Sequence, residues 1–169
     1  DFDFTGGCDE SFPNNTIYLS HGVDNGTCEG DDTVSITQED CENSEVNGGA
    51  GTWNANITKE VWYNVDFTIY DFSFEINGAD ASSLIPGDNI PPNDCTFTES
   101  PCYNLSLNAF TQTVVSSAIN PDYGVEVNCG TLLTLNGFAD FEADLINISF
   151  EEQVVYYYDN ECPTSTYDC

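Results

Sequence analysis

The clearest pattern of hydrophobic and polar positions runs over residues 61–76. Apolar side chains take the odd positions up to Ile69, with polar residues between most of them, which is typical of a strand with one buried face. From Phe72 onward the apolar side chains take the even positions. Because a shift of one residue turns every side chain to the other face, two interpretations stay open. Either one strand carries a bulge near residues 70–71, or two strands are joined by a tight break.

Similar short runs of β-branched and aromatic residues fill much of the remaining chain, separated by Gly, Pro or Asn. They predict strands at residues 1–7, 16–20, 33–37, 103–110, 111–119, 124–128, 131–135, 138–152 and 153–158. The run at 138–152 repeats the reversal of phase. The prolines at 86, 91 and 92 favour an exposed loop or crossover, because proline cannot donate to the hydrogen bonds of a central strand. No long segment shows a capped apolar stripe of helical period.

These elements predict an all-β fold, a disulfide-stapled antiparallel β-sandwich or open barrel with a long loop-rich N-terminal region. The 169 residues are enough for one domain with a sizeable core. Residues 8–55 are rich in Gly, Asn, Asp and Glu. We therefore expect a single secreted β domain over residues 1–169, in which residues 1–55 are a Cys-stapled, loop-rich segment and residues 56–169 hold the main strands.

Eight cysteines indicate a disulfide framework, because their number is even and no CxxC metal-binding spacing occurs. They are Cys8, Cys28, Cys41, Cys95, Cys102, Cys129, Cys162 and Cys169. Three precede the long pattern at 61–76 and five follow it. If all eight pair within the chain, at least one bridge joins the loop-rich region to the main strands. Disulfides imply an oxidising compartment, so we expect a secreted, extracellular or cell-surface protein.

The charge is extreme, with thirty Asp and Glu against one Lys and one His, for a formal net charge of −29. Internal salt bridges cannot compensate so many carboxylates, so high salt, divalent cations or low pH would have to neutralise the surface. Nucleic acid is excluded as a partner, because binding it requires many basic side chains. No apolar run approaches the ~18 residues that span a bilayer.

One acidic cluster has the composition of a calcium site. Asp24, Glu29, Asp31 and Asp32 lie within nine residues, and Ca²⁺ prefers several oxygen ligands from a flexible loop. The spacing is not that of an EF-hand loop. Calcium is therefore the one metal that the sequence suggests, and the proposed fold requires no other cofactor.

Five N-x-S/T sequons predict N-linked glycans in an extracellular protein. They begin at Asn14, Asn25, Asn56, Asn104 and Asn147. Strand alternation places Asn104 opposite Leu105 and Asn147 opposite Ile148, so both asparagines are expected to point outward.

Catalysis is poorly supported by the sequence. A Ser–His–Asp site would need His21, the only histidine, and no G-x-S-x-G turn presents a serine. Phosphoryl transfer lacks a P-loop. We expect His21 to be a loop residue and the protein not to be an enzyme.

Two aromatic segments could mediate contacts between copies of the chain. Residues 1–7 alternate, with Phe2 and Phe4 on one face before two glycines, and such a strand could pair within its own sheet as an ordinary first strand or add to a neighbour's sheet. Tyr156, Tyr157 and Tyr158 place rings on both faces of a strand. We expect a structural extracellular glycoprotein, a self-assembling subunit of a surface filament, pilus-like appendage or coat. The alternative is a secreted calcium-dependent carbohydrate-binding module.

Overall fold

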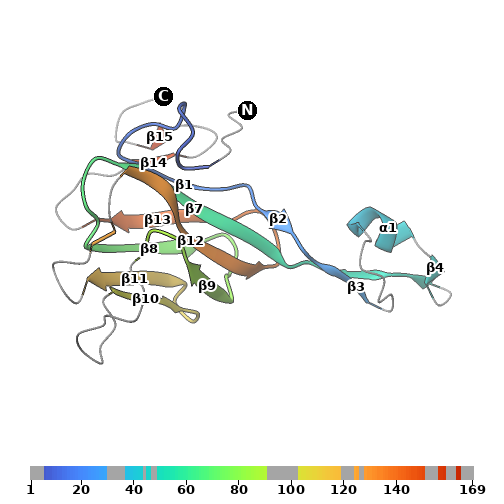
Figure 1. The fold of residues 1–169 in the computed structure, drawn as a ribbon. Helices are drawn as coiled ribbons and strands as arrows, with labels where there is room; N and C mark the ends of the chain where they lie inside the picture. Colours follow the sequence, from blue (N-terminus) through green and yellow to red (C-terminus); the bar gives the residue numbers. More distant parts are fainter. Residues whose placement is uncertain are drawn as a thin grey trace.

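The computed structural model describes residues 6–29, 37–43, 45–46, 49–90, 103–118, 124–125, 128–150, 156–158 and 163–164. Their strands form two main sheets and two short ribbons (Figure 1). The larger sheet has the order β15 (Pro163–Thr164), β14 (Tyr156–Tyr158), β1 (Thr16–Leu19), β7 (Ile57–Val65), β12 (Asn128–Phe138), β9 (Ser83–Pro86), with β2 (Val23–Asp24) also on β7. The smaller sheet has the order β10 (Tyr103–Asn108), β11 (Thr113–Ala118), β8 (Asp71–Asn77), β13 (Asp144–Ser149).

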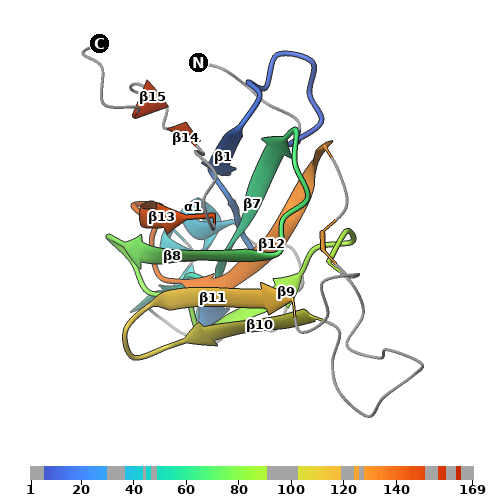
Figure 2. The same cartoon turned by 90° about the vertical axis from the view of Figure 1, so that its left-hand side faces the viewer.

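The two sheets face each other across one hydrophobic core, and their strands cross (Figure 2). Alternate residues of both sheets enter this core, among them the fully buried Tyr63 and Leu133 of the larger sheet and Phe74 and Val114 of the smaller. Neighbouring strands are antiparallel except for β1 and β14, which run parallel. The predicted disulfide-stapled all-β fold is thereby confirmed.

The phase reversal in residues 61–76 is a crossing from one sheet to the other. Strand β7 alternates between buried and half-buried residues up to Val65, and β8 starts again in the opposite phase at Asp71. Between them, Ile69 forms an isolated antiparallel bridge with Val125. Of the two interpretations, the one with two strands and a break is confirmed. The side chains change parity because residues 66–70, which join the two strands, do not continue the regular alternation of a strand.

The reversal in residues 138–152 has a different cause. Strand β13 shifts its register on β8 between Ile146 and Ser149, and Asn147 between them has a φ of 52°, the left-handed conformation common at bulges. The predicted single strand was wrong at its start, because Phe138 ends β12. Residues 139–143 turn before β13, and there the Asp140 carboxylate accepts a hydrogen bond from the Glu142 N–H (2.9 Å).

The loop-rich region holds more regular structure than its composition indicated. A short helix, α1 (Gln38–Asn43), begins after Thr37, whose side-chain oxygen accepts from the Asp40 N–H (3.2 Å) and donates to the Asp40 carboxylate (2.9 Å). This reciprocal cap is the reason that Thr37 does not continue the strand predicted at 33–37, whose other residues lie outside the described part. Pro86 ends the edge strand β9, where a missing N–H is tolerated, rather than lying in a loop.

Two ribbons and α1 form an arm that projects from the sandwich (Figure 1). The arm comprises the described residues between 25 and 56. Its ribbons pair β3 (Thr27–Glu29) with β6 (Thr52–Asn54), and β4 (Glu45–Val46) with β5 (Gly49–Ala50). The Cys28–Cys41 disulfide joins β3 to α1. A Cβ on Gly51 would come within 2.6 Å of the Cys28 sulfur, so this position requires glycine.

A second disulfide, Cys8–Cys129, joins the start of the described chain to β12. It is a bridge of the kind that the cysteine count required between the loop-rich region and the main strands. Next to it, Gly7 lies so close to β12 and β7 that a Cβ would meet the carbonyl oxygens of Gly130 and Tyr63. The prediction of disulfide bonds is therefore confirmed. The remaining cysteines, Cys95, Cys102, Cys162 and Cys169, lie outside the described residues.

Candidate functional site

The border between the edge strands β9 and β10 carries apolar side chains that the core covers only in part. The two strands end their respective sheets in the described part of the chain and lie next to each other (Figure 2). Leu84, Leu105 and Leu107 pack against the core from this border but are only half-buried. At the opposite edge of the smaller sheet, Leu145 and the adjacent Phe150 are each only 2% exposed, and Ile148 is half-buried. An added strand would therefore bury apolar surface at the β9–β10 border.

The main chain of β10 is also oriented to accept another strand. The Ala118 N–H donates to the Tyr70 carbonyl (2.8 Å), so even-numbered residues of β11 turn their main-chain groups toward β8 and odd-numbered ones toward β10. The register pairs these odd residues with even residues of β10 such as Ser106. Leu105 and Leu107 thus turn their N–H and C=O groups to the open edge of β10, the side with which no strand in the described part of the chain pairs. Such an edge is a template for pairing with another chain.

The hairpin formed by β10 and β11 is free of charge in a chain of net charge −29. Residues 103–118 contain no Asp, Glu, Lys or Arg. At its turn the Asn108 carboxamide accepts hydrogen bonds from the N–H groups of Phe110 and Thr111 (3.0 and 3.2 Å). This turn holds Phe110 98% exposed, and Val115 is exposed on the outer face of β11. Two copies of this acidic protein would repel each other least through this surface.

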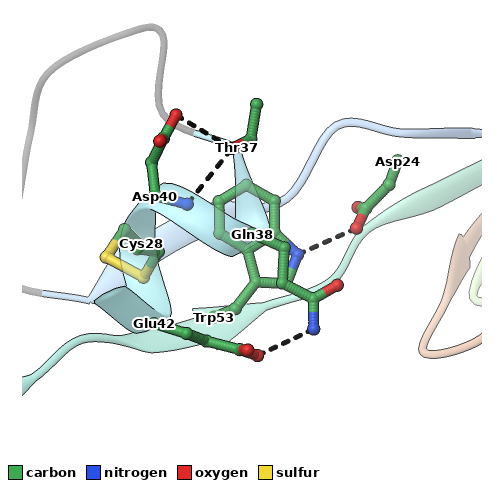
Figure 3. Close-up of a disulfide and its surroundings, with 8 residues drawn as sticks. Asp24, Cys28, Thr37, Gln38, Asp40, Glu42 and Trp53 are labelled. Carbon is green, nitrogen blue, oxygen red and sulfur yellow. Dashed lines mark hydrogen bonds between the residues drawn. A yellow bond between two sulfur atoms is a disulfide. The ribbon is translucent and has the colours of Figure 1, made fainter. Parts of the chain in front are cut away.

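Asp24, one of the predicted cation ligands, is a hydrogen-bonding centre at the root of the arm. Its carboxylate accepts from the Trp53 indole N–H (2.8 Å), the Gly26 N–H (2.8 Å) and the Asn56 N–H (3.0 Å). Figure 3 shows the indole reaching Asp24 beside the disulfide at Cys28. Burial raises the pKa of Asp24, but the three hydrogen bonds outweigh it, so the pKa is lowered.

Calcium binding at the predicted cluster remains a proposal. The carboxylate oxygens of Asp24 accept hydrogen bonds within the arm, and Glu29 is exposed on β3. Asp31 and Asp32 lie outside the described residues. In the described part of the chain, no three His, Cys, Asp or Glu side chains gather as a metal-binding group.

Substituting Asp24→Asn is expected to loosen the arm. One carboxylate oxygen serves Gly26 and Asn56 and the other serves Trp53, so the amide group of Asn would face the indole N–H with a second donor. We expect a loss of about 2 kcal/mol in local stability, because a hydrogen bond to a charged group is lost. The measurement is the exchange rate of the Trp53 indole proton by NMR. Asp80→Asn, at an exposed position, is the control, and equal exchange in both variants would contradict the assignment.

The only lysine and the only histidine meet at Phe141. Lys59 is 3% exposed, and its ammonium group donates to the Phe141 carbonyl (2.7 Å). The exposed ring of His21, which lies in a loop as predicted, stacks on the Phe141 ring at 4.8 Å. Burial lowers the pKa of Lys59, while Asp144 and Asp140 act in the opposite direction. The sequence carried a signal for this burial, because Lys59 shares the phase of Val61 on β7.

All five sequon asparagines are exposed. The amide of Asn25 donates to the hydroxyl of Thr58, the third residue of the Asn56 sequon (3.5 Å), so two sequons lie side by side at the root of the arm. Asn104 faces outward from β10, as predicted. Asn147 also faces outward, although its amide donates to Glu75 (3.0 Å). The surface is therefore accessible to glycans at each sequon.

The aromatic contact residues predicted from the sequence are only partly described. The main chain of Tyr156, Tyr157 and Tyr158 forms β14, which pairs with β1. Their side chains, and Phe2 and Phe4, lie outside what the structure describes.

No protein-family model matches the chain, and neither the curated proteins nor the solved structures include a significant match. In the described residues, no helix is long and apolar enough to cross a membrane. The case for a function therefore depends on this chain's own residues.

Proposed function

We propose that this protein is a non-enzymatic structural glycoprotein of the cell exterior, the self-assembling subunit of a surface filament, pilus-like appendage or coat. The observation that carries the proposal is the β10–β11 hairpin. It combines a strand edge that no described strand covers, half-buried apolar side chains and an uncharged outer surface in a protein whose net charge is −29. Strand exchange by the N-terminal segment is the proposed mode of assembly.

The extracellular location is supported by the two disulfides, which are typical of oxidising compartments. The exposure of all five sequon asparagines supports N-linked glycosylation. Peptide mapping of the native protein by mass spectrometry, before and after removal of N-glycans, tests this part. We expect glycans on the exposed sequons, and unmodified asparagines at all five would contradict it.

Assembly is tested by negative-stain electron microscopy and light scattering of the native protein. We expect regular filaments or sheets. Particles of the size of a single chain at every concentration and ionic strength would contradict self-assembly. Calcium titration and glycan-binding assays would then test the alternative, a calcium-dependent carbohydrate-binding module.

Phe110→Asp is expected to weaken assembly by about tenfold or more, because it introduces a charge into the proposed contact. The fold should be unaffected, within about 0.5 kcal/mol, since the side chain is 98% exposed. Val23→Asp is a matched control: Val23 is also apolar and exposed (65%), and the substitution adds the same charge far from the hairpin (Figure 1). Light scattering against protein concentration measures the difference. Equal weakening by both variants would indicate a general charge effect and contradict a contact at the hairpin.

A further inference from the structure

We propose that the open edge of β10 is the acceptor for residues 1–5 of a second copy, which adds as a strand with Phe2 and Phe4 beside Leu105 and Leu107. This inference depends on the proposed function and extends it, because it names both the donor segment and the receiving edge.

The apolar residues of the donor and of the acceptor have the same spacing along their strands. Phe2 and Phe4 are two residues apart, as are Leu105 and Leu107, so one register places both aromatic rings on the face that points to the core. Leu105 and Leu107 are also the residues whose N–H and C=O groups turn to the open side of β10. The same two residues thus offer the main-chain hydrogen bonds and the half-covered apolar surface.

The polar positions of the donor are also compatible with this edge. If Phe2 and Phe4 face the core, Asp1 and Asp3 face outward, on the same side as Asn104, Ser106 and Asn108. These side chains are neutral and can donate hydrogen bonds to carboxylates.

Within one copy, the residues to which the donor is attached lie away from β10. Gly7 and the Cys8–Cys129 disulfide fix the root of the segment against β12 and β7. In both views, the described segment that leads from Cys8 to β1 lies at the end of the molecule opposite to β10 (Figures 1 and 2). Five residues span at most about 18 Å. We therefore assign the donor of one copy to the β10 edge of another copy.

A donor attached at one end of the molecule and an acceptor edge at the other define a head-to-tail contact. Such a contact uses two different surfaces, so each added copy presents a new open edge. The repeat continues as a linear filament unless the rotation between copies closes a ring. The position of the two elements thus favours a filament over a closed dimer.

The test uses the full chain carrying Phe2→Ser and Phe4→Ser, which removes the apolar donor residues and leaves the acceptor unchanged. A peptide with the sequence of residues 1–7 is added, and amide hydrogen exchange is followed by NMR. We expect exchange at Leu105 and Leu107 to slow by about tenfold, since each gains a main-chain partner. Asn104 and Ser106, which face β11, should not change. A peptide with both phenylalanines replaced by serine is the control.

The outcomes separate this inference from the proposed function. If the native protein forms filaments but the peptide protects neither leucine, self-assembly stands and β10 is not the acceptor. Protection of both leucines in the substituted chain without peptide would show that another part of the same chain covers the edge, which overturns the inference. Concentration-independent protection in a monomeric native protein would show insertion within one copy and overturn it as well.

Discussion

Removing the Cys8–Cys129 disulfide, by Cys8→Ala with Cys129→Ala, is expected to lower the free energy of unfolding by about 5 kcal/mol. The two cysteines are separated by 121 residues, so the bond restricts a very large loop in the unfolded chain. The whole stability of a typical domain is about 5–15 kcal/mol, so the variant should be close to unfolding at room temperature. Urea unfolding followed by tryptophan fluorescence measures the loss.

The second disulfide offers the control. Cys28 and Cys41 are separated by only 13 residues, for which the same loop-entropy relation gives about 3 kcal/mol. This bond lies in the projecting arm, so we expect Cys28→Ala with Cys41→Ala to accelerate hydrogen exchange in the arm and leave the amides of β7 and β12 protected. An equal loss of global stability in both variants would contradict a special role of the longer bridge.

Lys59→Ala is expected to lower the free energy of unfolding by about 3 kcal/mol, because it leaves a cavity among buried side chains and a carbonyl at Phe141 without its donor. Lys59→Met keeps the apolar stem and loses mainly the hydrogen bond, about 1 kcal/mol. Urea unfolding of the three proteins at neutral pH tests this order. Unchanged stability in Lys59→Ala would contradict a role of this residue in the core.

The pH dependence gives a second test of Lys59. Burial lowers its pKa in the folded state below the ordinary value of 10.5, so the unfolded chain binds more protons between these two values. Stability must then rise with pH across that window, as the cost of burying the ammonium charge is removed. Lys59→Met should lack this rise. Burial raises the pKa of Tyr63, which opposes the rise near pH 10, but Tyr63 is present in both proteins, so their difference isolates Lys59.

The stability of the arm at low pH depends on Asp24, whose carboxylate stabilises the folded state in its charged form, whereas burial disfavours the charged form of Lys59. The pKa of Asp24 is lowered in the folded state, so its contribution is complete above the ordinary value of 3.8 and is lost as the pH falls through the folded value. The root of the arm is therefore held together in moderately acidic surroundings, where an unperturbed carboxylate would begin to be protonated.

The strands could be predicted wherever a short-range pattern decides the structure. The alternation up to Ile69 and from Phe72 onward identified both central strands, because each has one face on the core. Whether the reversal was a bulge or a crossing depended on which sheet each strand joins, and that is decided by contacts distant in sequence. The second reversal, at Asn147, is a bulge within one strand, and this too depends on the pairing of β13 with β8, which is distant in sequence.

The candidate site was predicted only in part for a related reason. Phe2 and Phe4 follow from local alternation, but the edge position of β10 depends on the order of strands in the finished sheet. Two further features of the site have a local signal in the sequence. Residues 103–118 carry no charge, and Lys59 shares the phase of the buried positions on its strand. The charge of Asp24 suggests a calcium ligand, but its hydrogen bonds with Trp53 and Asn56 cannot be inferred from the spacing of these residues in the sequence.

The Cys8–Cys129 bond also determines how the chain would respond to mechanical tension. A force applied at Gly6 passes through the disulfide directly to β12, and every strand from β1 to β11 lies in the closed loop that it bypasses. Because of the bond, the 121 residues of the loop, about 400 Å when fully extended, cannot be stretched by this force. While the bond is oxidised, each protein is a short, stiff link between Gly6 and β12; once the bond is reduced, unfolding of the strands under load would turn the same protein into a long extensible tether.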